Sequence, residues 1–94
     1  MTGPLSKIKL APRAIRDLKG LDRQTRKRVQ NAFQALETDA ANLDKPVAGR
    51  APWRRLRVGE HRVLYRELTD EPDARYLVAR VIDRRDLHRA IDKL

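Results

Sequence analysis

The residues with the clearest chemical potential in this sequence are arginines that alternate with apolar residues on both sides of a short turn. Leu56 and Val58 precede the turn, which begins at Gly59, and Val63 and Tyr65 follow it. If these four apolar side chains face the core, the alternation of a strand directs the side chains between them to the opposite face. The arginines expected on that face are Arg55, Arg57, Arg62 and Arg66.

Such a cluster of arginines favours an anionic ligand. Guanidinium groups on one face repel each other unless an anion lies among them, and each carries a planar set of donors that matches phosphate oxygens. The alternative is that these arginines are solvated and neutralised by the neighbouring acids Glu60, Glu67 and Asp83. The pattern as a whole favours phosphate binding, although any one arginine fits either interpretation.

The overall charge agrees with an anionic partner. The chain of 94 residues has 22 Lys and Arg against 13 Asp and Glu, a net charge of +9. Sixteen of the basic residues are arginines, and eleven of these lie between positions 50 and 89. This excess predicts nucleic acid, an acidic protein or a membrane surface as partner, but it says nothing about fold.

Several classes of chemistry are absent from the sequence. There is no cysteine, which excludes disulfides, thiolate metal sites and cysteine nucleophiles. No glycine-rich phosphate loop and no histidine or carboxylate cluster with metal-ligand spacing is present, so we expect neither a metal nor another cofactor. No apolar run approaches the length of a membrane span or a signal peptide, which leads us to expect a cytoplasmic protein without a membrane partner.

The elements that must position the arginines follow from the periodicity of the chain. Period-two alternation or β-branched runs predict strands at 7–10, 53–58, 61–68 and 76–82. Helical spacing predicts a helical hairpin, with one helix from Pro12 to Gly20 and a longer one capped by Asp22, and a last helix over 84–94. The stretch 42–52, interrupted by prolines and a glycine, is expected to be a loop.

This order of elements predicts one α+β domain over residues 1–94. The order is β-α-α-β-β-β-α, with a small antiparallel sheet packed by the N-terminal αα-hairpin and the C-terminal helix. We expect Tyr65 in the core, and Trp53 as a core anchor at the edge of the sheet more than as a base-stacking platform.

Three segments resemble the RelE/ParE superfamily of toxins from type II toxin–antitoxin systems. The segment 53–65, WRRLRVGEHRVLY, is similar to the hairpin signature of that family, and 81–88, VIDRRDLH, is similar to its closing motif. The preceding segment 45–50, KPVAGR, fits its Lys-Pro-Leu-x-Gly loop. The resemblance covers nearly the whole chain and implies the RelE fold, which is similar to that of microbial ribonucleases.

For the RelE branch the resemblance implies cleavage of mRNA in the ribosomal A site. The ribose 2′-OH attacks the adjacent phosphate without a metal ion, leaving a 2′,3′-cyclic phosphate and a 5′-OH. By motif, the catalytic positions fall on Arg55, Arg57, Arg62, Arg84 and His88. Arg54, Arg66 and Arg85 flank them and are expected to bind RNA. The implied partners are mRNA, the ribosome with its rRNA, and a RelB-like cognate antitoxin.

The sequence departs from the family pattern at its ionisable positions. Asp83 stands where the family has the histidine of a Gly-His-Arg motif, and His88 stands where it has a tyrosine. Because arginine is a poor base and His61 and His88 are the only imidazoles, His88 is either the acid or base of the reaction or an ordinary exposed helix residue. For His61, beside the turn in the core-facing register, we favour a structural role.

A second function remains open. ParE-type relatives share the fold and the hairpin signature but inhibit DNA gyrase by binding, without nuclease chemistry. The four arginines at 55, 57, 62 and 84 favour the RelE type, whereas the missing terminal tyrosine favours the ParE type. A plain RNA-binding module or an inactive relative is the third interpretation.

Overall fold

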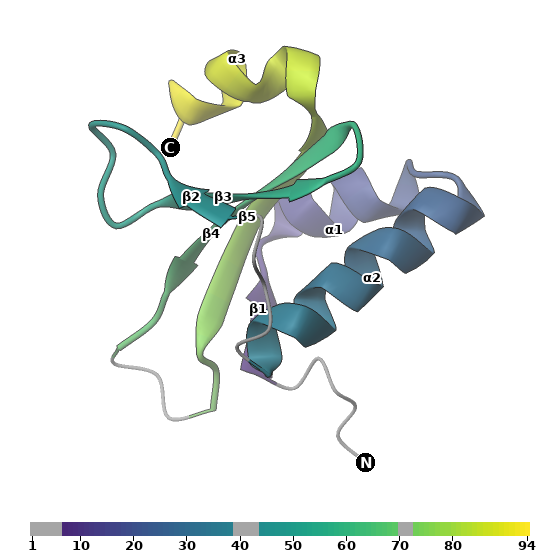
Figure 1. The fold of residues 1–94 in the computed structure, drawn as a ribbon, viewed down its shortest axis with the longest axis horizontal. Helices are drawn as coiled ribbons and strands as arrows, with labels where there is room; N and C mark the ends of the chain where they lie inside the picture. The colour runs from purple at the N-terminus through teal and green to yellow at the C-terminus, as the bar shows by residue number, and fades with distance from the viewer. Residues whose placement is uncertain (1–6, 39–43, 70–72) are drawn as a thin grey trace.

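In the computed structural model, which describes residues 7–38, 44–69 and 73–94, five strands form one mixed sheet (Figure 1). Their spatial order is β1-β5-β4-β3-β2. β1 runs parallel to β5, and all other neighbours are antiparallel. The strands are β1 (Ile8–Leu10), β2 (Asp44–Pro46), β3 (Arg54–Val58), β4 (His61–Glu67) and β5 (Tyr76–Asp83).

Two helices between β1 and β2 form an αα-hairpin that lies against one face of the sheet (Figure 1). They are α1 (Pro12–Lys19) and α2 (Arg23–Glu37). Proline suits the start of α1, where its missing N–H has no helical partner. Asp22 caps α2, as its spacing predicts, by accepting a hydrogen bond from the backbone N–H of Thr25 at 3.4 Å. Arg26 braces the connection by donating from Nε to the carbonyl of Leu18 at 3.0 Å.

The sheet separates two apolar clusters. On the side of α1 and α2, the larger cluster includes Phe33, Leu56, Val63 and Tyr65. On the other side, Leu64 and Ile82 pack with residues of the last helix and with the half-buried Trp53. The predicted core position of Tyr65 is therefore confirmed, and Trp53, predicted as a core anchor, packs half-buried against the second cluster.

The last element is shorter than the sequence predicts. It begins as a single 3₁₀ turn, η2 (Arg84–Asp86), and continues as α3 (Leu87–Ile91). Asp83 ends β5 and caps the turn by accepting from the backbone N–H of Arg85 at 2.9 Å. The 3₁₀ turn therefore starts directly at the end of β5, and α3 follows it.

The predicted α+β class and the order of the predicted elements are confirmed, with two differences in detail. Asp44–Pro46 forms the edge strand β2 inside the stretch expected to be a loop, because its backbone pairs with β3. The sheet is mixed, since β1 joins β5 in parallel. The sequence also predicts a turn over 69–73, around Pro72; this turn and the start of the expected loop over 42–52 lie partly outside the described residues. Across 7–38, 44–69 and 73–94, no helix is both long and apolar enough to cross a bilayer.

Candidate phosphate-binding site

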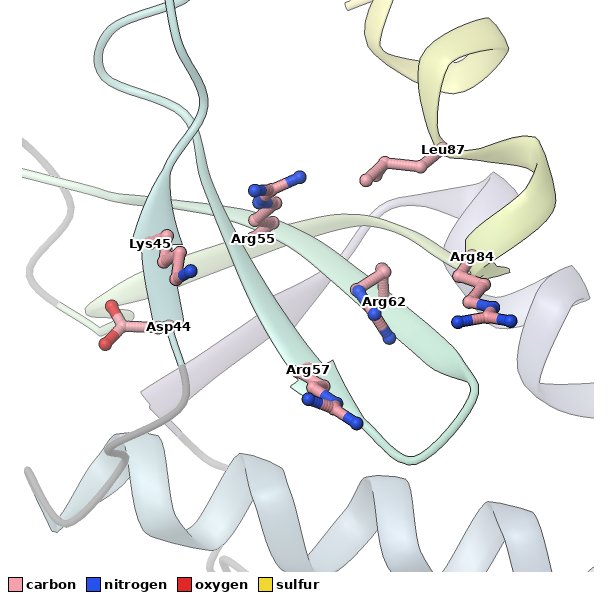
Figure 2. A pocket seen from close by; sticks show the side chains of 7 residues that line it. All are labelled: Asp44, Lys45, Arg55, Arg57, Arg62, Arg84 and Leu87. Atoms are coloured by element: carbon pink, nitrogen blue, oxygen red, sulfur yellow. The ribbon is translucent and has the colours of Figure 1, made fainter.

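A cavity of about 450 Å³ lies over β3 and β4, on the side of the sheet that carries α3. One wall is the edge strand β2, and the opposite wall is η2 with the start of α3 (Figure 2). Four of the lining residues are arginines. Three of them come from β3 and β4, which form the floor, and one comes from η2. The lining residues are Asp44, Lys45, Arg55, Arg57, Arg62, Arg84 and Leu87.

Strand alternation places three of the arginines in this cavity. The cross-strand partners Leu56 and Val63 are buried in the larger core, so their neighbours along each strand point the other way. Arg57 lies directly opposite Arg62 in the β3–β4 ladder, an arrangement in which like charges repel. The turn between them begins at Gly59, whose φ of 59° suits a glycine. This confirms the prediction that Arg55, Arg57 and Arg62 lie on one face of the sheet.

Arg62 is at the centre of this positive charge. Partial burial lowers the pKa of its guanidinium, and the nearby charges of Arg57, Arg55 and Arg84 lower it further. Its Nη1 donates to the carbonyl oxygens of His61 at 2.9 Å and Gly59 at 3.1 Å. These bonds hold the side chain along the turn without neutralising its charge.

Acidic neighbours neutralise little of the cluster. Arg84 Nε lies 3.2 Å from Glu60 Oε1, but both side chains are more than half exposed, and such pairs stabilise weakly. Neither Arg55 nor Arg57 has a side-chain hydrogen bond or ion pair within residues 7–38, 44–69 and 73–94. The other two candidate acids pair elsewhere, since Glu67 lies 3.9 Å from Arg75 and Asp83 lies 3.2 Å from Arg85. The arrangement therefore suits a phosphate among the arginines.

The three arginines assigned to RNA binding from sequence lie outside the cavity lining. Arg54 is the cross-strand partner of Tyr65 and pairs with Asp44 at 2.7 Å, on the face of the αα-hairpin. Arg66 stacks over Trp53, with its Cζ 5.9 Å from the ring centroid. Arg85 is exposed beside Asp83.

The two histidines also lie apart from the cavity lining. His61 is half-buried and pairs across the sheet with Val58 and Asp83. Strand alternation places it on the face opposite Arg62. His88 is exposed on α3, one residue after Leu87, which does line the cavity.

Lys45, like its neighbour Asp44, lines the cavity although the sequence prediction did not single it out. It faces Arg55 across the β2–β3 ladder. Its only sequence signal is its place in the KPVAGR segment, and a strand of three residues within a proline-containing stretch has too little periodicity to predict. Over the described parts of the chain, no group of three or more His, Asp or Glu side chains is placed to hold a metal ion.

Comparison with known proteins identifies the family. The family model for the ParE toxin of type II toxin–antitoxin systems matches residues 8–88. The chain belongs to the ParE toxin family. It is therefore a toxin of the RelE/ParE superfamily, as the hairpin and closing motifs indicate. No curated protein matches the sequence of this toxin.

Solved structures show that the toxin has a RelE-like fold. The RelB–RelE antitoxin–toxin complex from Methanococcus jannaschii superposes with a TM-score of 0.69 at 22% identity, covering 87% of this chain and 96% of that one. The RelBE2 toxin–antitoxin complex from Mycobacterium tuberculosis gives 0.68 at 28% identity, covering 83% and 96%. The DinJ–YafQ complex from E. coli gives 0.59 at 18% identity, covering 85% and 94%.

Proposed function

We propose that this toxin is a ribosome-dependent endoribonuclease that cleaves mRNA in the A site by attack of a ribose 2′-OH on the adjacent phosphate. The observation that supports the proposal is the convergence of four arginines from β3, β4 and η2 on one cavity, where Arg55 and Arg57 have no acidic partner among the described residues. Arginines without acidic partners in the protein suit a polyanionic ligand, because the negative charges of the ligand neutralise them. RNA meets that requirement.

The proposed reaction explains why arginines are useful there. As the 2′-oxygen approaches phosphorus, negative charge grows on the non-bridging oxygens, and fixed guanidinium donors stabilise it where it develops. Arg62 is held in place by two backbone carbonyls, so its donors need little reorganisation. Loss of one such donor typically lowers the rate by about 10²–10³. The proposed catalytic arginines are Arg55, Arg57, Arg62 and Arg84.

In the proposed mechanism, the base that takes the 2′-OH proton is His88. It lies in α3 directly after Leu87, which lines the cavity, although His88 is not itself a lining residue. Its exposure lets the ring exchange protons with water. An imidazole changes charge near neutral pH, which an arginine does not.

The flanking arginines divide between two roles. Arg66 and Arg85 are proposed to contact RNA outside the cavity, where Arg85 is exposed and Arg66 is half-exposed beside Trp53. Arg54, in contrast, is committed to Asp44 by a 2.7 Å bond on the other face of the sheet. We therefore assign Arg54 a structural role in place of the RNA contact expected from sequence.

Cleavage of mRNA on programmed ribosomes tests the proposal. Purified toxin, added to ribosomes stalled with a defined A-site codon, should cut the mRNA within that codon, as mapped by primer extension. The products should carry a 2′,3′-cyclic phosphate and a 5′-OH. Arg66→Ala, as a matched arginine outside the cavity, should retain more activity than Arg62→Ala. Intact mRNA after incubation with folded wild-type toxin would refute the nuclease assignment.

Inhibition of DNA gyrase is the second candidate function, because the family model that matches residues 8–88 is the ParE model. In this case the arginine cavity would bind a protein or DNA phosphates without cleaving RNA. A supercoiling assay with purified gyrase and toxin tests this candidate. Gyrase inhibition together with intact ribosomal mRNA would favour the ParE type.

A RelB-like antitoxin is the proposed partner that keeps the toxin inactive. The similar structures from Methanococcus jannaschii and Mycobacterium tuberculosis are antitoxin–toxin complexes. An antitoxin for this chain should bring acidic residues to the arginine cavity. Opposite charges speed association in a manner sensitive to salt. The association rate constant should therefore fall as salt rises from about 50 to 500 mM, and a rate that hardly changes would show that the antitoxin approaches another surface.

A further inference from the structure

The two walls of the arginine cavity lie on opposite sides of the position where a phosphate would be held. β2 forms one wall, and η2 with the start of α3 forms the other (Figure 2). Displacement at phosphorus places the attacking and leaving oxygens roughly in line. A base on the α3 side therefore requires the group that protonates the leaving 5′-oxygen to lie on the β2 side.

Only one lining side chain on the β2 side is suited to give a proton. Arginine remains protonated throughout the accessible pH range, so the four guanidinium groups are poor donors of a proton. Asp44 also lies in β2, but its carboxylate is turned away from the four cavity arginines (Figure 2). Lys45 carries a primary ammonium with three donors, and it is turned toward the arginines.

A hydrogen-bond network fixes the orientation of β2. Asp44 Oδ2 accepts from Arg54 Nε at 2.7 Å and from the Tyr65 hydroxyl at 2.7 Å. These bonds anchor Asp44 on the face of the αα-hairpin, where its cross-strand partner Leu56 is buried. Because successive side chains of a strand alternate, the next residue, Lys45, is directed to the cavity face.

The protonation states within this network keep the anchor in place. Burial raises the pKa of Tyr65 to about 12, and its hydrogen bond to Asp44 contributes to the shift, so the hydroxyl remains a donor. Burial opposes ionisation of Asp44, but the hydrogen bonds from Tyr65 and Arg54 outweigh it and leave the pKa of this carboxyl below its usual value. The carboxylate is thus ionised, and it accepts both bonds at neutral pH.

We propose that Lys45 is the general acid that protonates the leaving 5′-oxygen, an inference that rests on the proposed ribonuclease function. The bond between the 2′-oxygen and phosphorus forms while the bond between phosphorus and the 5′-oxygen breaks. The leaving oxygen keeps the electron pair of the broken bond and takes one proton from the Lys45 ammonium. The 2′-OH proton goes to His88, and the Lys45 amine afterwards regains a proton from water.

A substrate whose leaving group needs no proton separates this role from a purely electrostatic one. The test uses two mRNAs on programmed ribosomes, one natural and one with sulfur in place of the bridging 5′-oxygen at the scissile bond. A thiolate leaves without protonation, because thiols have a pKa of about 8.5. Lys45→Arg keeps the positive charge but removes the proton donor, and Lys27→Arg on the exposed surface of α2 is the matched control.

We expect Lys45→Arg to slow single-turnover cleavage of the natural linkage by about 10²–10⁴-fold. Cleavage of the sulfur-containing linkage should stay within a few-fold of the wild-type rate, and the control should match the wild type on both. Equal slowing of both linkages, or no slowing of either, would overturn the assignment of Lys45. Wild-type toxin that cleaves neither mRNA would instead refute the proposed function itself.

Discussion

Two groups of arginines in this toxin differ in what surrounds their guanidinium groups. Arg54 and Arg80 each bind a carboxylate, Arg54 with Asp44 at 2.7 Å and Arg80 with Asp17 through two bonds of 2.8 and 3.2 Å. Arg55, by contrast, has no such partner among the described residues, although it is the sequence neighbour of Arg54. Residue type therefore does not separate a structural arginine from a ligand-binding one. The side of the strand and the presence of a carboxylate do.

The two groups of arginines also differ in their effect on the stability of the fold. The Arg80–Asp17 pair is mostly buried, with side chains 21% and 17% exposed, and Asp17 Oδ2 also accepts from the backbone N–H of Val81 at 2.9 Å. It joins α1 to the interior strand β5, so it stabilises the fold. The cavity arginines instead repel one another, since Arg57 faces Arg62 across the ladder, and this repulsion destabilises the fold. We expect substitutions in the first group to change stability and substitutions in the second to change activity.

The largest expected loss of activity follows from removing the proposed base. His88→Ala should slow cleavage of mRNA on the ribosome by about 10²–10⁴-fold, because the 2′-OH proton loses its acceptor. The variant should unfold with the wild-type midpoint, since the side chain is exposed. His88→Tyr, which restores the usual family residue, should retain much of the activity. Equal rates for wild type and His88→Ala would return His88 to the role of an ordinary helix residue.

Arg62→Ala should lower the cleavage rate by about 10²–10³, because Arg62 is the most central of the clustered guanidinium groups. The thermal midpoint should stay within a few degrees, because the side chain bonds only to carbonyls of the exposed turn. Growth arrest after induction, together with a thermal melt of the purified protein, measures both effects. Full toxicity from a folded Arg62→Ala protein would contradict the proposed mechanism.

Asp17→Ala should lower the stability and leave the activity of the folded protein unchanged, the reverse of Arg62→Ala. It leaves Arg80 without its carboxylate and Val81 without an acceptor for its N–H, and an unsatisfied buried group costs about 1–3 kcal/mol. Urea unfolding should show the free energy of unfolding lowered by about this amount. Cleavage by the folded fraction should match the wild type. A large loss of activity without a loss of stability would erase the distinction between the two groups.

The smallest expected effect is a pH dependence of stability carried by Asp44. Its pKa in the folded toxin lies below the ordinary value, despite burial, because Tyr65 and Arg54 donate hydrogen bonds to the ionised form. The stabilisation is therefore complete above the pKa of the unfolded chain and is lost as pH falls through the lower folded value. Thermal melts over the acidic range should show a shallower decline for Asp44→Asn than for the wild type. Parallel declines would mean that the Asp44 network does not secure β2.

The amino-acid sequence by itself determined the face that each residue of the β3–β4 hairpin presents. Alternation around Gly59 separates Leu56 and Val63 from Arg57 and Arg62, and the structure follows that division. The cap at Asp22 and the bounds of α1 were also predictable. These features depend on a few neighbouring residues, whose spacing is visible in the chain.

Tertiary structure alone decided which distant residues complete the cavity. Lys45 joins Arg55 only because β2 pairs with β3, and Asp44 selects Arg54 because the same pairing brings their side chains together. Leu64 shares its strand face with Arg62, yet it is fully buried under a second core formed with α3. The physical reason is that pairing between segments far apart in sequence is set by the free energy of the whole assembled sheet and core. A local period carries no information about it.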